Sequence, residues 1–115
     1  MFSEAIYCDE FSTWIDSLTE DEADRIFAAI GVLEEVGPNL KRPQVGTIKG
    51  SLVRNLKELR VQIAGKPWRI LFAYDKRRRP VMLAGGDKSV DARWYDINIP
   101  TDEARFLRHQ AGLKN

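Results

Sequence analysis

The spacing of apolar residues changes near the middle of the chain, and this change limits the possible folds more than any other feature. In the first third, apolar residues recur every three or four positions, the spacing of one helix face. The first such run consists of Phe11, Trp14, Ile15 and Leu18. From residue 59 onward they alternate with other residues, as in β-strands. The sequence of 115 residues is 43% hydrophobic, which suits one soluble domain. We therefore predict a single α+β domain over residues 1–115.

Two helices are expected in the first third, after a short strand over residues 2–7. Asp9 is a candidate N-cap of the first helix. Thr19, with Glu22 three positions later, forms a capping-box pattern at the start of the second helix. Gly37 and the proline after it predict the end of that helix.

A three-stranded antiparallel meander is expected next, after a basic connection over residues 40–54. Its strands are predicted over residues 59–63, 68–74 and 81–84. The central strands carry apolar residues on both faces, so other elements must cover both faces. Gly85 and Gly86 are expected to end the meander. The tail from Asp91 is predicted to be helical, with a break near Pro100.

Charge is divided unevenly along the chain. Residues 1–40 contain ten acidic residues and one basic residue, a net charge of −9, whereas residues 41–115 contain 17 basic and seven acidic residues, a net charge of +10. Such asymmetry is typical of a protein with a face that binds a polyanion. Alternatively, the acidic half neutralises the basic half within the fold.

Several common sites are excluded by the residues present. The only cysteine is Cys8 and the only histidine is His109, which argues against a disulfide, a zinc site and a Ser-His-Asp triad. There is no phosphate-loop or dinucleotide-binding glycine pattern, and we expect neither cofactor nor metal. No apolar run is long enough for a membrane span and no secretion signal is recognisable, so we expect a cytoplasmic protein that does not contact a membrane. Catalysis would have to use Arg, Lys, Tyr, Asp or Glu, a set suited to phosphodiester cleavage by a neighbouring 2′-hydroxyl.

Two arginines on neighbouring predicted strands are candidates for binding phosphate. Arg60 and Arg69 are expected on adjacent antiparallel strands, where the two guanidinium groups could clamp a phosphate. The alternative is a cross-strand ion-pair network with Glu58 that covers the sheet.

A run of basic residues lies in the second predicted turn, at positions 76–79. Arg77, Arg78 and Arg79 in this run could hold RNA through its phosphates. The alternative is a solvated turn whose charge keeps the protein soluble.

The segment after the last strand also combines basic and aromatic residues. Lys88 and Arg93 are followed by Trp94 and Tyr95. A phenol beside basic side chains suits proton transfer, and aromatic rings beside them suit stacking on unpaired RNA bases. The alternative for Trp94 is a place in the core, and for Tyr95 half-exposed packing.

Several of these segments together resemble the HigB-like, phage-derived branch of the RelE toxin superfamily. The matching segments are residues 55–60 (NLKELR), 68–75 (WRILFAYD), 83–88 (LAGGDK) and 94–95 (WY). The resemblance implies a RelE-like fold: a twisted, mainly antiparallel sheet with an N-terminal helical hairpin and a C-terminal helix. It also implies the toxin of a type II toxin–antitoxin pair, a metal-independent endoribonuclease that cleaves mRNA, often on the ribosome. Its partner would be a helix-turn-helix antitoxin similar to HigA.

The resemblance also assigns roles to single residues. Arg69 matches the family's most recurrent catalytic arginine and would stabilise the transition state. Arg60 matches the family's basic residue at the end of the second strand and is a further catalytic candidate. Lys88 falls in the family's basic segment, and Tyr95 matches a tyrosine that some members use for proton transfer or base stacking. Glu58 stands where RelE itself has a catalytic lysine, so it is either the general base or a partner of Arg60.

The remaining basic residues among the candidates are expected to contact RNA outside the reaction centre. They are Lys57, Arg77, Arg78, Arg79 and Arg93. Lys57 points to the opposite face of an ideal strand from Glu58 and cannot simply replace the missing lysine. A non-catalytic nucleic-acid- or partner-binding domain of phage origin is therefore the alternative function.

Overall fold

The computed structural model describes residues 3–113, and its α+β architecture agrees with the predicted fold class. Phe2, part of the expected first strand, lies outside the described residues. The elements in chain order are β1 (Ile6–Tyr7), α1 (Asp9–Asp16), α2 (Glu20–Val36), the 3₁₀ helix η1 (Gly37–Asn39), β2 (Val45–Thr47), β3 (Lys57–Ile63), β4 (Lys66–Tyr74), β5 (Pro80–Asp87) and α3 (Trp94–Ala111).

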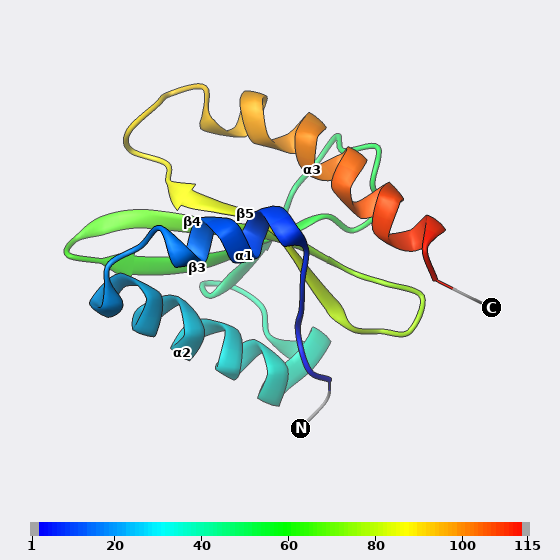
Figure 1. Ribbon diagram of the computed structural model, residues 1–115, viewed down its shortest axis with the longest axis horizontal. Coiled ribbons are helices and arrows are strands. Elements are labelled where there is room, and N and C mark those ends of the chain that lie inside the picture. The colour runs from blue at the N-terminus through cyan, green and yellow to red at the C-terminus, as the bar shows by residue number, and fades with distance from the viewer. Residues whose placement is uncertain (1–2, 114–115) are drawn as a thin grey trace.

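The strands form one mixed, five-stranded sheet in the order β1-β5-β4-β3-β2 (Figure 1). The β3-β4-β5 meander is antiparallel, as predicted, while β1 pairs in parallel with β5. A further strand that was not predicted from the sequence, β2, pairs antiparallel with β3 at one edge of the sheet. This strand has only three residues, too few to show an alternating pattern.

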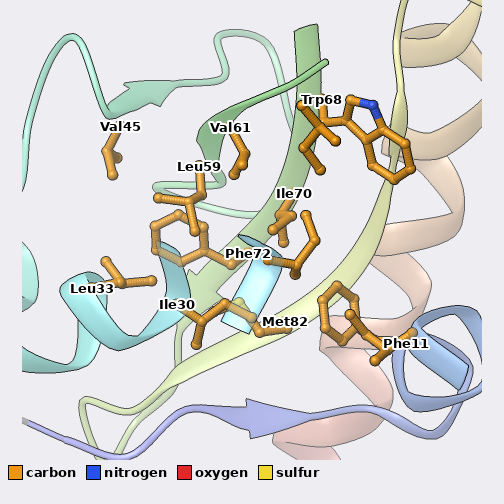
Figure 2. Close-up of a cluster of buried hydrophobic side chains, with 13 residues drawn as sticks. Phe11, Ile30, Leu33, Val45, Leu59, Val61, Trp68, Ile70, Phe72 and Met82 are labelled. Atoms are coloured by element: carbon orange, nitrogen blue, oxygen red, sulfur yellow. The ribbon is translucent and has the colours of Figure 1, made fainter. Parts of the chain in front are cut away.

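Helices cover both faces of the sheet, as the two-sided apolar strands require. On one face, α1 and α2 pack on side chains of β3, β4 and β5. Figure 2 shows Phe11, Ile30 and Leu33 directed toward Ile70 and Phe72 of the sheet. On the other face, α3 contributes Phe106 to a second core with strand residues and the segment before β3. Figure 1 shows α2 and α3 on opposite sides of the strands.

Two of the three predictions for the helix ends are confirmed. Thr19 and Glu22 form both hydrogen bonds of the predicted capping box. Gly37, with φ of 71°, ends α2 in a backbone conformation that suits glycine. The expectation for Asp9 is wrong, because Cys8 occupies the N-cap position and makes no side-chain capping bond there. Asp9 lies instead in the first turn of α1, where its negative charge interacts favourably with the positive end of the helix dipole.

The two adjacent glycines do not end the meander, because β5 continues through them to Asp87. Each glycine makes room for an indole ring on its own face of the sheet. A Cβ atom at Gly85 would lie 2.4 Å from the ring of Trp14, and one at Gly86 would lie 2.7 Å from Nε1 of Trp94. Trp94 is buried, in agreement with its expected place in the core.

Pro100 does not break the last helix, contrary to the prediction, and α3 runs through it. The helix is fixed to the sheet on both sides of the proline, by Trp94 over Gly86 and by Phe106 in the second core. The free energy gained from this packing outweighs the cost of the one backbone hydrogen bond that the proline cannot make. None of the helices within residues 3–113 is both long and apolar enough to span a membrane.

Candidate functional site

The candidate site lies where β3 and β4 run side by side. Arg60 of β3 and Arg69 of β4 are directly opposite each other in the strand register. Residues directly opposite in an antiparallel pair project from the same face of the sheet, so the pattern places both guanidinium groups together as predicted. Beside them is an open cleft of about 310 Å³, and its lining consists of Pro43, Gln44, Arg60, Gln62 and Arg69.

Glu58 joins the site residues, and its side chain is only 9% exposed. Its Oε2 atom accepts hydrogen bonds from Arg60, at 3.1 Å from Nη2 and 3.3 Å from Nε. Its Oε1 atom accepts one from the hydroxyl of Tyr95 at 2.5 Å and lies 3.7 Å from Nε of Arg69. One buried carboxylate therefore contacts both arginines and the phenol, as the ion-pair interpretation expects.

Arg69 is the less exposed of the two arginines. Its side chain is 12% exposed, against 31% for Arg60. Nη1 of Arg69 donates to the carbonyl of Trp68 at 2.9 Å, while its buried Nε has no hydrogen-bond partner among the described residues. The guanidinium is thus held by its own strand and by Glu58 at the inner end of the cleft.

Tyr95 reaches the site from the first turn of α3, next to the indole that packs over Gly86. Burial, followed by the hydrogen bond and negative charge of Glu58, raises the pKa of Tyr95 to about 12. The phenol therefore keeps its proton near neutral pH and can act as a proton donor. Nζ of Lys88 lies 5.6 Å from the centre of the Tyr95 ring, within the range of a cation–π contact. Arg60, Arg69, Glu58, Tyr95 and Lys88 thus form one connected group.

Gly46 also contributes to the site, although it was not predicted from the sequence; it lies opposite Glu58 on the edge strand β2. A Cβ atom at Gly46 would lie 2.7 Å from Nη2 of Arg60 and 3.2 Å from Oε2 of Glu58. The guanidinium therefore lies against the bare backbone of β2. A glycine in a strand is a general sign of such close approach, but β2 itself was not predicted.

The other predicted RNA-binding residues do not join this group. Lys57 borders a different cavity, beside β2 and the end of α2. Arg79 binds the buried carboxylate of Asp75, which His109 of α3 also contacts at 2.9 Å. Arg93 pairs with its neighbour Asp91 before α3.

The two remaining arginines of the basic turn are exposed. They are Arg77 and Arg78. The backbone N–H of Arg77 donates to Asp75 at 2.9 Å, so that carboxylate shapes the turn. Arg78 has a positive φ of 62°. The turn presents charge at the surface without adding a side chain to the cleft.

Part of the charge asymmetry is neutralised inside the fold. Glu10 of the acidic helix α1 pairs with Arg108 of α3 at 2.6 Å and lies 3.6 Å from Arg105. Between α1 and α3, acidic residues of the N-terminal part therefore neutralise basic residues of the C-terminal part, which is the alternative explanation of the uneven charge. Neither ion pair involves the basic residues that border β2.

Comparison with protein-family models gives a match over residues 13–107 to the family described as phage derived protein Gp49-like (DUF891). The matched region includes every residue of the site described above. The chain belongs to the Gp49-like family. The similarity to phage-derived, HigB-like proteins predicted from residues 55–60 and 68–75 is thereby confirmed.

Two curated relatives of this Gp49-like chain come from Mycobacterium tuberculosis. The "Putative toxin HigB2" is 42% identical over 109 residues, a match that covers 93% of this chain and 54% of that protein. The chain thus spans about half the length of HigB2. The "Putative toxin HigB3" is 44% identical over 93 residues, which cover 80% of each chain.

Proposed function

We propose that this protein is the toxin of a toxin–antitoxin pair and acts as an endoribonuclease on mRNA, including mRNA on the ribosome. The observation that carries the proposal is the cross-strand pair of Arg60 and Arg69 beside an open cleft, with Tyr95 in reach. The toxin names of two relatives support it. In the reaction, the 2′-hydroxyl gives its proton to a water molecule and its oxygen attacks the adjacent phosphorus, so that an O2′–P bond forms, the P–O5′ bond breaks and O5′ takes up a proton. The products are a 2′,3′-cyclic phosphate and a 5′-hydroxyl.

The two arginines suit the charge that develops during this step. Negative charge builds on the non-bridging oxygens of the phosphate, and a guanidinium donates two parallel hydrogen bonds to such oxygens. Arg69 is held in place by the carbonyl of Trp68 and by Glu58, so little rearrangement is needed at the moment of reaction. Arg69 is therefore the main stabilising residue in our proposal, and the more exposed Arg60 assists it.

Tyr95 is the proton donor to the leaving O5′ atom in this proposal. Its pKa of about 12 keeps the phenol protonated near neutral pH, so the hydroxyl has a proton to donate. Lys88, close to the ring, adds positive charge beside the leaving oxygen.

Glu58 acts in our proposal as a positioning residue that holds both arginines. Both of its carboxylate oxygens already have partners, Arg60 on one and Tyr95 on the other, and the side chain is largely buried. To take the 2′-hydroxyl proton, it would first have to release Arg60 or Tyr95. The arrangement therefore favours positioning over the general-base role that the sequence left open.

A helix-turn-helix antitoxin encoded by the neighbouring gene completes the proposal. Because the relatives are named as HigB toxins, a HigA-like protein is the expected partner. Co-expression of that protein should restore growth and yield a complex that co-purifies. A neighbouring product that neither binds nor protects would argue against the pairing.

Induced expression in a bacterium tests the function. We expect growth arrest, together with new mRNA ends that carry a 5′-hydroxyl. Purified protein should cleave mRNA, and assays with and without ribosomes separate ribosome-dependent from free cleavage. Growth that continues normally, with no new RNA ends in a strain that contains the folded protein, would refute the proposal.

The second candidate function is a domain that binds nucleic acid without cleaving it. The observation in its favour is that Glu58 neutralises part of the positive charge of the arginine pair. This candidate predicts that purified protein binds RNA, that no cleavage occurs with or without ribosomes, and that growth is unaffected.

A further inference from the structure

A second cavity lies beside the edge strand β2, outside the group around Glu58. Its volume is about 530 Å³. Its lining consists of Pro38, Leu40, Lys41, Arg42, Val45, Gly46, Thr47, Lys49 and Lys57. Four of these residues are basic and none is acidic.

Among the described residues, the four basic residues of the cavity lining have no ion-pair partner, whereas most arginines of this protein have one. Arg25, Arg60 and Arg69 each pair with a carboxylate, as do Arg79, Arg93, Arg105 and Arg108. Within residues 3–113, the side chains of Lys41, Arg42, Lys49 and Lys57 make no ion pair or hydrogen bond. Unpaired positive charge gathered around one hollow attracts an anion.

The cavity and the cleft beside Arg69 flank the same short piece of chain. Arg42, Val45 and Gly46 border the cavity, while Pro43 and Gln44 border the cleft. The backbone of Gly46 also lies against the guanidinium of Arg60. One extended polyanion could therefore occupy both hollows by crossing residues 42–46.

The lining also indicates which part of a nucleic acid would lie there. Among residues 3–113, no aromatic side chain borders the cavity, so this part of the chain offers no surface there for stacking a base. Lysine and arginine side chains bind backbone phosphates without reading sequence. We infer that this cavity binds phosphate groups of the RNA strand that flank the bond cleaved in the Arg60–Arg69 cleft. The inference rests on the proposed function and adds a second contact region to it.

A salt titration of RNA binding tests the inference with the full chain. The probe is a fluorescein-labelled, fully 2′-O-methylated single-stranded RNA, which lacks the attacking hydroxyl and stays intact. The slope of log affinity against log salt is negative, and each lost phosphate contact on a single strand makes it shallower by about 0.7. Lys41→Gln/Lys49→Gln should therefore make the slope shallower by about 1.4 and weaken binding to all RNA sequences alike.

The matched control removes two bases that border neither the cavity nor the cleft, Arg25 of α2 and Arg54 before β3. Arg25→Gln/Arg54→Gln has the same loss of charge on exposed side chains. It should leave the salt slope unchanged. An equal loss in this control, or wild-type binding by Lys41→Gln/Lys49→Gln, would overturn the inference.

Two further measurements separate this inference from the proposed function and from an acidic protein partner. If the wild type fails to cleave unmodified RNA, the proposed function fails; if it also fails to bind the probe, the inference fails with it. If the wild type cleaves and the cavity variant binds and cleaves equally well, the inference alone fails. If the variant loses binding to an oligoglutamate peptide but keeps RNA binding, the cavity is a protein-docking site and the inference is wrong.

Discussion

Nε of Arg69 lies 3.7 Å from Oε1 of Glu58, and the two side chains are only 12% and 9% exposed. The same carboxylate also holds Arg60 and Tyr95. An ion pair and a candidate phosphate-binding site are therefore the same group of atoms. Substitutions here should affect stability and activity together, and the balance between the two effects distinguishes the roles of these residues.

Arg69→Ala should lower the RNA cleavage rate by about 10² to 10³, the typical loss of one preorganised charge contact. The ion pair with Glu58 predicts a loss of stability as well. We expect the free energy of unfolding to fall by about 1–2 kcal/mol, less than the roughly 3–5 kcal/mol for a buried pair broken by loss of one partner, because Glu58 keeps two donors. Cleavage assays and urea denaturation measure the two effects.

Arg25→Ala is the control for Arg69→Ala, since its ion pair with Asp21 is exposed on α2. It should change stability by less than about 1 kcal/mol and leave cleavage intact. A folded Arg69→Ala protein that cleaves RNA at the wild-type rate would show that Arg69 is not catalytic.

Glu58→Gln should lower the pKa of Tyr95 from about 12 toward 10. Burial raises this pKa most, and the hydrogen bond and charge of Glu58 raise it further; the variant removes the charge and keeps the burial and an oxygen that can accept the hydrogen bond. An NMR titration of the Tyr95 ring measures the shift. Tyr74, whose pKa of about 12 results from burial alone, serves as an internal reference and should not move. An unchanged Tyr95 pKa would contradict the effect of the Glu58 charge on this phenol.

Asp102 should make the protein less stable as the pH rises. Burial raises the pKa of Asp102 from 3.8 to about 7, while the charge of Arg105 opposes the rise. Between about pH 4 and about pH 7 the folded state keeps a proton that the unfolded chain releases, so the free energy of unfolding falls with increasing pH. Asp102→Asn should remove roughly 2–4 kcal/mol of this dependence, measured by urea denaturation across that range.

Asp87→Asn is the matched control for Asp102→Asn. Hydrogen bonds from Ser89 lower the pKa of Asp87, so this carboxylate is already ionised in the range tested. The control should therefore retain the pH dependence of the wild type. A flat wild-type profile between about pH 4 and about pH 7 would show that Asp102 titrates normally.

Gly85→Ala should destabilise the protein by about 1–3 kcal/mol, because the new methyl group would overlap the ring of Trp14. Thermal unfolding measures the change, and Trp14 fluorescence should report a shifted ring. Gly31→Ala is the contrasting variant: apart from its chain neighbours and the backbone of its own helix, no atom of the described residues lies within 4 Å of its Cβ position in α2, and alanine should stabilise the helix by about 0.5–1 kcal/mol. Equal stability of the two variants would contradict the tight packing at Gly85.

Features set by neighbouring residues could be predicted from the sequence. The capping box of Thr19 and Glu22, the end of α2 at Gly37 and the β3-β4-β5 meander all depend on contacts a few positions apart or on regular spacing. The pairing of Arg60 with Arg69 followed from a short hairpin between alternating strands. Local propensity and periodicity were sufficient for these predictions.

Other features depend on contacts between distant parts of the chain. The edge strand β2 exists because β3 is there to pair with it, and Gly46 gains its role only where Arg60 lies against it. Pro100 stays within a helix because Trp94 and Phe106 fix that helix to the sheet on both sides. Tyr95 reaches Glu58, 37 positions earlier in the chain, only because α3 packs across the sheet. Such long-range packing can outweigh local preferences, and a pattern of neighbouring residues does not encode which distant groups will meet.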